Sequence, residues 1–238
     1  MAAGAKSDVC VILLAGGVGK RFGLAVPKLL TLIKGRPVIA YTLQTAISLP
    51  FVAQVIVACN ALLRSEVEKV LETVMKSAKS PASIEIIDGG NSRSSSVGLA
   101  LKQVKCQTVL IHDADRPIAG ESLYKRVYAA VNPGVGVVPV ISPADSILRE
   151  DARGNPANYI PRADLMLVQT PQGFITSEYR MVREILGAQV EKYTDDGSAF
   201  LAGGYQLRAV PGERGNIKIT FPVDLAIAEA YINESGDA

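Results

Sequence analysis

Residues 9–23 read VCVILLAGGVGKRFG, an unbroken apolar run that passes directly into a glycine-rich segment. A short continuous apolar run is typical of a strand buried on both faces, as in a parallel sheet covered by helices. Gly16, Gly17 and Gly19 allow the backbone to approach a ligand closely and to turn its N–H groups outward. We therefore expect a first strand over 9–15 that ends at a phosphate-binding turn.

Strand-like and helical patterns alternate along the rest of the chain. Strands are predicted at 52–59, 84–87, 108–112, 136–141 and 205–210, and helices at 37–49, 62–75, 122–131, 177–186 and 222–231, with a further helix beginning near Ser92. Such β-α repetition predicts a three-layer α/β domain around a mostly parallel sheet. At 238 residues the chain is long enough for one well-buried domain, so we expect 1–238 to form a single unit.

The pattern breaks at 142–164, which is polar and contains Pro143, Gly154, Pro156 and Pro161. Long structureless loops are uncommon inside compact domains and are often functional when they occur. The segment therefore favours an extended β-arm that projects from the domain, with a surface loop as the alternative. The core is expected to resume at Leu165.

The bulk composition describes a globular protein with no general affinity for polyanions. Hydrophobic residues make up 48% and charged residues 20%, and the net charge is only +2. This excludes a broad nucleic-acid or membrane surface, so any basic site must be local. No apolar run reaches the ~18 residues that a membrane span needs. No secretory pattern precedes residue 9, which predicts a cytoplasmic protein, or a protein of the plastid stroma if a transit peptide has been removed.

The three cysteines, Cys10, Cys59 and Cys106, are far apart and form no C-x-x-C pair. They predict neither a disulfide framework nor a zinc site. All three lie in or beside apolar runs, so we expect free thiols buried in the core.

The glycine-rich segment matches neither of the two common phosphate-binding fingerprints. No Ser or Thr follows Gly19-Lys20 as in a Walker loop, and Phe22 stands where a dinucleotide fingerprint needs its last glycine. Arg21 and Lys28 flank the loop that follows. Two cations beside a glycine-rich turn can stabilise the charge that builds up as a polyphosphate leaves a pentavalent α-phosphorus.

The segment AGGVGKRFG at 15–23, followed by Pro27-Lys28, resembles the signature of sugar-phosphate nucleotidyltransferases. Within that group the chain resembles the 2-C-methyl-D-erythritol 4-phosphate cytidylyltransferases of the non-mevalonate pathway of isoprene biosynthesis. Further matching motifs are GGNSRSSSV at 89–97, HDADRP at 112–117, TPQ at 170–172, TDD at 194–196 and NIKIT at 216–220. Their order extends the resemblance over nearly the whole chain. It implies a Rossmann-like nucleotidyltransferase fold and transfer of a cytidylyl group from CTP to a polyol phosphate.

The resemblance also implies which residues bind the nucleotide. The triphosphate and its Mg²⁺ would lie across the first turn, and cytosine and ribose would lie at the second glycine pair, with Ser96 on the base. The implied nucleotide-binding residues are Ala15, Gly16, Gly17, Gly19, Gly89, Gly90 and Ser96. A purely structural role for Asn91 or Ser92 as a helix cap is compatible with this assignment.

The acceptor side is implied in the same way. Asp113 would face the polyol, Arg116 would approach its phosphate, and Lys218 would position that phosphate. Ser146 stands at a threonine position of the family and keeps the hydroxyl. Arg162 aligns with an arginine that grips the phosphate from a neighbouring subunit, which implies a homodimer with interlocked arms. The implied catalytic set is Arg21, Lys28, Arg162 and Lys218.

Five residues, near the strand end at 108–112 and in the TDD motif, need separate treatment. His112 is the only histidine, and we expect it to be structural because an ionised phosphate nucleophile needs no general base. A carboxylate such as Asp113 can also help to seat Mg²⁺ beside a triphosphate, but the sequence does not identify metal ligands. Asp115 departs from the family, which has a small residue there, and should point into solvent or pair with an arginine. We expect Asp195 and Asp196 to be structural or to back the site residues.

Three rival functions remain compatible with parts of the pattern. A cytidylyltransferase for ribitol 5-phosphate would share the nucleotide motifs. A nucleotide-sensing module would bind CTP without releasing pyrophosphate, and the presence of both Arg21 and Lys28 argues against it. A nicotinamide dehydrogenase is disfavoured by Phe22 and by the Pro27-Lys28 pair.

Overall fold

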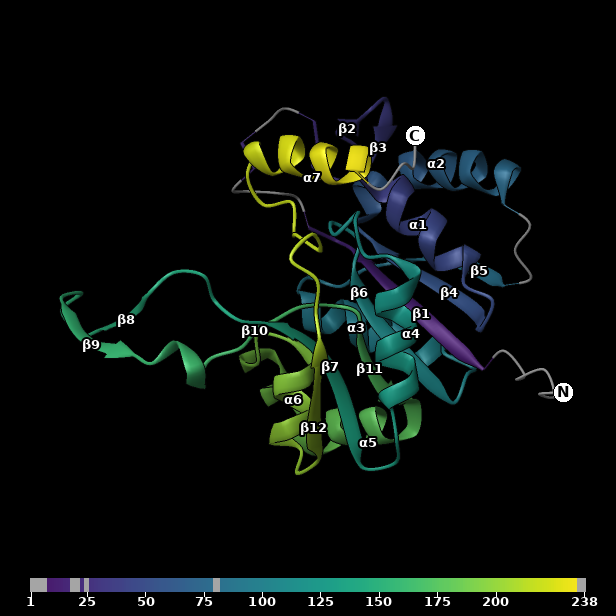
Figure 1. The fold of residues 1–238 in the computed structure, drawn as a ribbon. Coiled ribbons are helices and arrows are strands. Elements are labelled where there is room, and N and C mark those ends of the chain that lie inside the picture. The colour runs from purple at the N-terminus through teal and green to yellow at the C-terminus, as the bar shows by residue number, and fades with distance from the viewer. Residues whose placement is uncertain (1–7, 18–21, 24–25, 79–81, 235–238) are drawn as a thin grey trace, which may run out of the picture.

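The structure is a computed structural model that describes residues 8–17, 22–23, 26–78 and 82–234. Within these ranges, eight strands form one sheet in the order β10-β7-β11-β6-β1-β4-β5, with β12 added beside β7. Its strands are β1 (Val9–Ala15), β4 (Val52–Cys59), β5 (Ser83–Asp88), β6 (Thr108–Asp113), β7 (Val135–Ile141), β10 (Leu167–Val168), β11 (Gln172–Ile175) and β12 (Gln206–Pro211). The helices are α1 (Val38–Ser48), α2 (Arg64–Ser77), α3 (Arg93–Gln103), α4 (Glu121–Ala130), α5 (Thr176–Leu186), α6 (Asp196–Ala202) and α7 (Val223–Glu234). Figure 1 shows this arrangement.

The sheet is mostly parallel, as the sequence predicts. β1 pairs in parallel with β4 and β6, β4 with β5, and β7 with β12. The exceptions are β10 and β11, which run antiparallel to their neighbours. β11 lies between β6 and β7, and it was not predicted from the sequence. Thr170, which precedes β11, lies beside the end of β6 and accepts from the Asp113 N–H, whereas the Gln169 N–H donates to the Pro139 carbonyl of β7.

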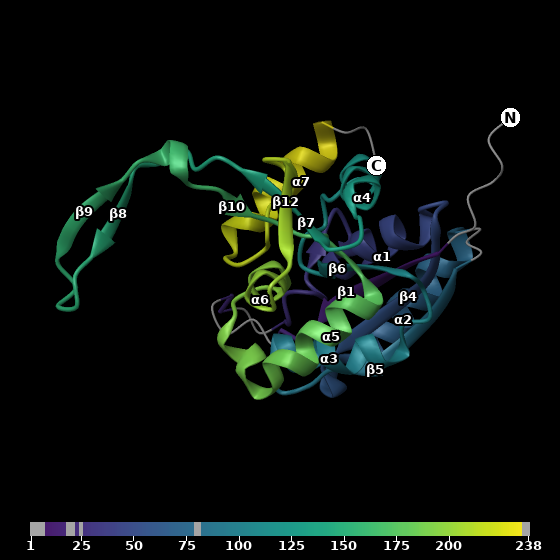
Figure 2. The same ribbon diagram turned by 90° about the horizontal axis from the view of Figure 1, so that it is seen from below.

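Strand alternation explains the three layers. Val9, Val11 and Leu13 of β1 join a core cluster with α1 and α4, whereas Cys10 and Ile12 join a second cluster with α3 and α5. Each face of the sheet is therefore buried under helices, which is why β1 carries no polar residue. Figure 2 shows α3 and α5 side by side on one of these faces. The three cysteines are buried and free, as expected.

The element boundaries follow the sequence closely wherever a chemical signal marks them. β4 occupies the predicted range, and α3 begins after Ser92, whose side chain forms a reciprocal capping box with Ser95. α6 begins the same way after Asp195, whose side chain accepts from the N–H of Ser198. Not predicted was the two-stranded hairpin of β2 (Leu32–Ile33) and β3 (Arg36–Pro37) before α1.

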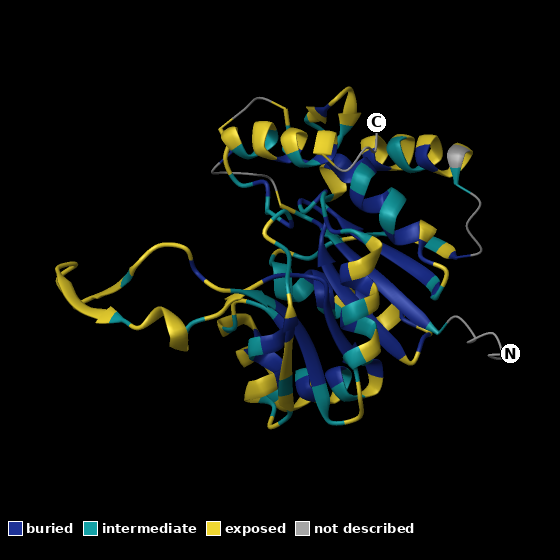
Figure 3. Cartoon of the chain, viewed as in Figure 1, coloured by how far each residue is buried: buried dark blue, intermediate teal, exposed yellow. Residues whose placement is uncertain are grey.

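The predicted arm is present as an antiparallel hairpin of β8 (Ile147–Glu150) and β9 (Pro156–Ile160), followed by a short 3-10 helix at Arg162–Asp164. It extends away from the domain (Figures 1 and 2) and is exposed along most of its length (Figure 3). The core does not resume at Leu165 as predicted. Met166, Leu167 and Val168 are still exposed, and burial begins at Gln169.

In the part of the chain that the structure describes, no helix is both long and apolar enough to cross a membrane.

Candidate functional site

A pocket of about 420 Å³ opens where β1, β5 and β6 end, the edge at which open α/β sheets bind ligands. The predicted site residues that line it are Gly16, Gly17, Lys28, Gly90, Ser96, Asp113 and Lys218. The residues that line this pocket come from widely separated parts of the sequence, from Leu14 to Thr220. The predicted residues Gly19 and Arg21 lie outside the described ranges.

Two glycine-rich turns form one wall of the pocket. Gly90 could carry no side chain here, because a Cβ would lie 2.2 Å from Ser95 Oγ. At Gly89 a Cβ would lie 3.0 Å from Ser96 Oγ and 3.2 Å from the Cys59 carbonyl oxygen. The close approach of the turn and α3 therefore favours glycine most strongly at Gly90, and a side chain at Gly89 would have to displace its neighbours by a few tenths of an ångström.

Ser96 is buried in the first turn of α3 and holds the second turn in place. Its hydroxyl donates to the Ser92 carbonyl at 2.8 Å and accepts from the Gly90 N–H at 3.0 Å. Ala15 is the last residue of β1; it is fully buried and does not line the pocket. The side of the turn that faces the pocket is therefore formed by Gly16 and Gly17.

Lys28 enters the pocket from a turn that follows the first glycine-rich segment. The Leu30 and Thr31 N–H groups donate to the Pro27 carbonyl, and Leu29 is buried in the core, so Lys28 is directed to the opposite side. Its ammonium group pairs with Asp115 and donates to the Ile219 carbonyl at 3.1 Å. Only 11% of its side chain is exposed.

The expectation that Asp115 points into solvent or pairs with an arginine is wrong. Its carboxylate neither points into solvent nor pairs with an arginine; it pairs with Lys28 through Oδ2. Oδ1 is buried and has no hydrogen-bond partner among the described residues. Burial, and after it repulsion from the Asp113 carboxylate, raises the pKa of Asp115 above its usual range.

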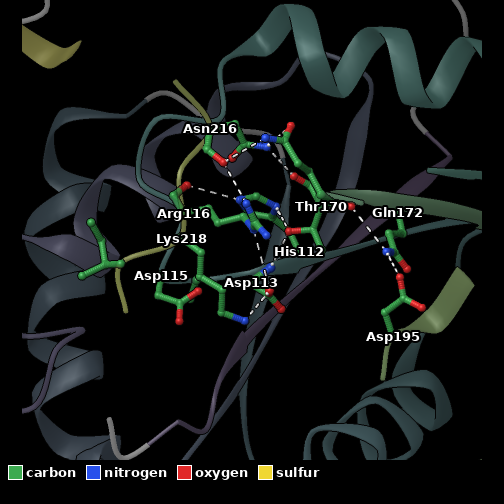
Figure 4. A network of polar contacts seen from close by, with 12 residues as sticks. His112, Asp113, Asp115, Arg116, Thr170, Gln172, Asp195, Asn216 and Lys218 are labelled. Carbon is green, nitrogen blue, oxygen red and sulfur yellow. Dashed lines mark hydrogen bonds and ion pairs between the residues drawn. The ribbon is translucent and has the colours of Figure 1, made fainter. Parts of the chain in front are cut away.

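Asp113 is the centre of a charge network at the end of β6 (Figure 4). Its carboxylate lies 2.8 Å from Lys218 Nζ, 3.3 Å from Arg93 Nε and 3.8 Å from Arg116 Nε. Burial alone would raise the pKa of this carboxyl group, but the three cations outweigh burial and hold the pKa well below its usual value. Asp113 is therefore ionised and fixes the cations around the pocket.

Arg93 lines the pocket and was not among the predicted site residues. It lies between two carboxylates, Asp113 and Asp196, and its Nη2 is 2.8 Å from Asp196 Oδ2. Although burial opposes its charge, these two carboxylates raise the pKa of the guanidinium group. The only sequence signal for Arg93 was its place in the motif at 89–97, three residues before Ser96. Asp196 in turn accepts from Tyr179 at 2.6 Å, so it backs the site as expected.

Arg116 and Lys218 belong to the same network but face different surroundings. Lys218 lines the pocket, whereas Arg116 does not and donates to the Asn216 carbonyl at 2.7 Å. Burial lowers the pKa of Arg116. The structure therefore places Lys218 at the pocket and Arg116 behind Asp113.

His112 is fully buried and faces away from the pocket into a hydrogen-bonded layer (Figure 4). Its Nδ1 is 2.8 Å from Thr170 Oγ1, and Thr170 Oγ1 accepts from the Asp113 N–H at 3.1 Å. Asn216 closes the layer by donating to the Thr170 carbonyl at 2.8 Å. Burial lowers the pKa of His112 to about 3, so the ring is neutral and structural, as expected.

Gln172 and Asp195 hold the strand β11 against α6. The Gln172 side chain donates to Asp195 at 2.8 Å and accepts from the Gly197 N–H at the same distance. These contacts explain why the TPQ and TDD motifs occur together: both fix the layer behind Arg93 and His112.

The predicted arm residues do not join the pocket of their own chain. Arg162 is exposed and donates to the Ala144 carbonyl at 2.7 Å, a contact within the arm. Ser146 lies beside the same hairpin and is also exposed. Figure 2 shows how far the arm extends from the domain.

A larger hollow of about 770 Å³ lies between α3 and α5, next to the second glycine turn. Its arginines are already engaged. Arg180 donates to the carbonyls of Leu101 and Val104, and Arg183 donates to that of Ser94. These side chains satisfy backbone carbonyls of α3 and of the residue that follows it. The smaller pocket is distinguished by its two glycine-rich turns and by Lys28 and Lys218.

The chain is similar to one enzyme family throughout. The profile of the 2-C-methyl-D-erythritol 4-phosphate cytidylyltransferases matches residues 9–234. A 2-C-methyl-D-erythritol 4-phosphate cytidylyltransferase of Frankia casuarinae is 34% identical over 235 residues, which cover 96% of this chain and 82% of that protein. A bifunctional enzyme IspD/IspF of Clavibacter michiganensis is 33% identical over 96% of this chain, and the chain spans 55% of that enzyme's length.

Solved structures agree with the sequence matches. The crystal structure of 2-C-methyl-D-erythritol 4-phosphate cytidylyltransferase from Thermus thermophilus has a TM-score of 0.74 and 29% identity, with 95% of this chain and 99% of that chain covered.

Proposed function

This chain belongs to the 2-C-methyl-D-erythritol 4-phosphate cytidylyltransferase family, and we propose that its chemistry takes place in the pocket at the ends of β1, β5 and β6. It is a nucleotidyltransferase of isoprenoid biosynthesis. It transfers a cytidylyl group from CTP to 2-C-methyl-D-erythritol 4-phosphate and releases pyrophosphate. The observation that carries the assignment to this pocket is the convergence of Lys28, Lys218 and two glycine turns on one volume.

The reaction is a direct displacement at the α-phosphorus of CTP. An oxygen of the polyol phosphate forms the new bond, and the bond from the α-phosphorus to the bridging oxygen breaks as pyrophosphate leaves. The attacking phosphate is already ionised, so the neutral, buried His112 has no proton to remove. Catalysis then depends on positioning the two phosphates and on stabilising the charge of the transition state.

On the nucleotide side, Gly16, Gly17 and Lys28 bind the triphosphate, with Arg21 and Gly19 of the same loop as further expected contacts. Gly89, Gly90 and Ser96 hold the cytidine. What supports this division is the geometry of the two turns: Gly90 could not be replaced without a clash, and Ser96 fixes its N–H.

On the acceptor side, Lys218 holds the attacking phosphate and Asp113 faces the polyol hydroxyls. Lys218 is 37% exposed in its side chain, which makes it the most accessible cation paired with Asp113. Arg116 acts through Asp113 and through the segment at Asn216 that carries Lys218. Asp113 thus sets the position of the acceptor cation.

The residues of the pocket fit a divalent cation such as Mg²⁺. Mg²⁺ is usually held by one or two carboxylates together with substrate phosphates. Both oxygens of Asp113 already face cations, whereas Asp115 has a buried oxygen without a partner among the described residues. Asp115 is therefore the residue that would hold it, and the cation would supply charge stabilisation at the triphosphate.

The arm supports a homodimer in which Ser146 and Arg162 complete the pocket of the partner subunit. Within one chain these residues lie on a projecting hairpin, and the apolar side chains Leu148, Tyr159 and Met166 are exposed there. Exposed apolar residues on a long projection are typical of an interface. A cytoplasmic location is part of the same proposal.

The test is a pyrophosphate-release assay that combines CTP, ATP, GTP and UTP with several polyol phosphates. We expect release with CTP and 2-C-methyl-D-erythritol 4-phosphate and at most trace release with ribitol 5-phosphate, an acceptor that the family matches do not favour. Equal turnover with ribitol 5-phosphate would contradict the acceptor assignment. CTP binding without any release of pyrophosphate would indicate a nucleotide-sensing protein instead of an enzyme.

A further inference from the structure

Lys28 and Asp115 present a conflict of charge inside the pocket. The cation that a triphosphate needs is already paired with a carboxylate, and both side chains are nearly buried, with 11% and 9% exposed. A triphosphate that draws Lys28 away would leave Asp115 as an unpaired anion beside three phosphates. A buried charge in that position is strongly unfavourable unless another cation or a proton replaces the lysine.

The unpartnered oxygen of Asp115 indicates which replacement the pocket favours. Asp115 lines the pocket, and its buried Oδ1 has no hydrogen-bond partner among the described residues, although a carboxylate oxygen is a ligand of the kind that divalent cations prefer. The backbone holds this residue in place, since the Ile219 N–H donates to the Asp115 carbonyl at 2.8 Å. The lysine, by contrast, has a flexible stem that can change partner.

We propose that Asp115 couples metal binding to nucleotide binding by exchanging Lys28 for the divalent cation that accompanies the triphosphate. Asp115 gives up Lys28 to the phosphates and takes the cation in its place, so the pocket contains no unpaired carboxylate at either stage. The proposal rests on the proposed function, because it requires CTP in this pocket. It assigns a positioning role to a residue that departs from the small residue of the family.

Asp113 could not perform this exchange, although it lies two residues away. Three cations already surround it, at 2.8, 3.3 and 3.8 Å, and they belong to the structural network with Asp196 and Asn216. Removal of any one would leave the other two in place. Among the described residues Asp115 forms one ion pair, with Lys28, while Lys218 favours its charge from a greater distance. Asp115 therefore loses its ion pair when Lys28 moves, whereas Asp113 would keep two.

The experiment measures nucleotide and metal affinity without turnover. The nucleotide probe is a CTP analogue with a methylene group between the α- and β-phosphorus, which cannot release pyrophosphate, and the metal probe is Mn²⁺. Titration calorimetry gives the analogue's Kd in EDTA and in saturating Mn²⁺, and electron paramagnetic resonance counts free Mn²⁺. The proteins are the full chain, Asp115→Ala and Asp115→Asn. The control is Asp88→Ala, which removes an exposed carboxylate at the same edge that pairs with Arg64 instead.

The exchange predicts opposite effects in the two conditions. Without metal, Asp115→Ala should bind the analogue about tenfold more tightly, because Lys28 is free and an anion is gone. In the complex with the analogue, both variants should bind Mn²⁺ about tenfold more weakly, because a ligand is lost. Asp88→Ala should match the wild type in both. A purely structural role for Asp115 would shift both affinities in the same direction.

The proposal is overturned if Mn²⁺ affinity is unchanged in both variants, or if metal-free nucleotide affinity does not increase. These results leave the function standing, because the wild type still binds the analogue. A wild type that binds no CTP analogue in either condition would overturn the function and the exchange together. Asp115→Asn keeps the side-chain size, so it distinguishes loss of a ligand from loss of packing if the alanine variant unfolds.

Discussion

The pocket and the arm place their charged residues in opposite environments. In the pocket, Asp113 and Asp115 are buried and engage cations that come from distant parts of the sequence. In the arm, Arg162 is exposed, and it donates to the carbonyl of Ala144 within the same arm. The pocket is thus assembled within one chain, whereas the arm projects from the domain and is exposed (Figure 3).

Different interactions hold the conformation of the pocket and that of the arm. Buried ion pairs hold the pocket because each charge would be costly to leave alone. The arm is held by the β8–β9 ladder and by a turn in which Asp151 accepts from the N–H groups of Arg153 and Asn155. Substitutions in the pocket should therefore change both stability and activity, and those in the arm should change activity alone.

The largest effect is expected for Lys28→Ala. Loss of the cation that binds the leaving group should lower turnover by about two or more powers of ten. The measurement is kcat from pyrophosphate release, with circular dichroism to show that the fold persists. The double variant Lys28→Ala/Asp115→Ala is the control, because it removes the buried carboxylate that the single variant leaves unpaired. It should regain thermal stability without regaining turnover, and an unchanged kcat in the single variant would remove Lys28 from the mechanism.

Next in size is the loss of stability on Asp113→Asn, about 3 kcal/mol at neutral pH, because three cations lose their common counter-charge. The folded-state pKa of Asp113 is depressed, so its contribution is fully present above the unfolded value near ~3.9 and is lost as the pH falls below it. Urea unfolding of both proteins from pH 3 to pH 8 should show a gap that is constant above about pH 5 and closes toward acid.

The arm supplies the matched control for Asp113. The pKa of Asp151 is also depressed, by its backbone hydrogen bonds, but this carboxylate is fully exposed. Asp151→Asn should therefore leave the unfolding curve nearly unchanged. Equal losses in the two variants would contradict the contrast between the pocket and the arm.

Arg162→Ala should reduce kcat/KM for the polyol phosphate by about tenfold to a hundredfold without lowering the melting temperature. If Arg162 serves the partner's pocket, an equal mixture of Arg162→Ala and Lys28→Ala subunits, allowed to exchange, should recover about a quarter of wild-type activity. Half the dimers would then be mixed, and each would hold one intact site of two. No recovery in a mixture that demonstrably exchanges subunits would confine Arg162 to its own chain.

The smallest expected effect is at His112. Because the chain has one histidine, its imidazole gives a single set of ring resonances in an NMR spectrum. Burial lowers the pKa of this ring to about 3, so its chemical shift should stay constant from pH 8 to pH 5. A titration midpoint near pH 6.5 would show that the ring is solvated and would reopen a general-base role.

The sequence predicted the parts of this molecule whose signals are local. The apolar run of β1 and the helix cap expected at Asn91 or Ser92 each depend on neighbouring residues, and the structure assigns the cap to Ser92. β11 escaped prediction because Gln172–Ile175 is short and includes Gly173, whose Cβ would meet Val131 and Leu110 within 3.0 Å. Its strand conformation comes from the neighbours β6 and β7, which are distant in sequence.

The same reasoning explains the errors around the pocket. Motif matching placed Lys28, Lys218 and Asp113 at the correct edge of the sheet, because strand ends of a parallel sheet converge there. It did not identify Arg93, which pairs with both Asp113 and Asp196, and it assigned the wrong kind of partner to Asp115. Both depend on which side chains meet across long sequence separations, and no local pattern encodes that.

The root of the arm has a consequence for how such proteins diversify. The chain leaves β7 at Ile141 and returns at Leu167, and these two residues are cross-strand neighbours. The pairing of β7 with β10 therefore holds the two ends of segment 142–166 together whatever its sequence. The entropy cost of closing such a loop grows only slowly with its length. The hairpin can therefore vary in length and sequence at this junction while the central sheet keeps its pairing.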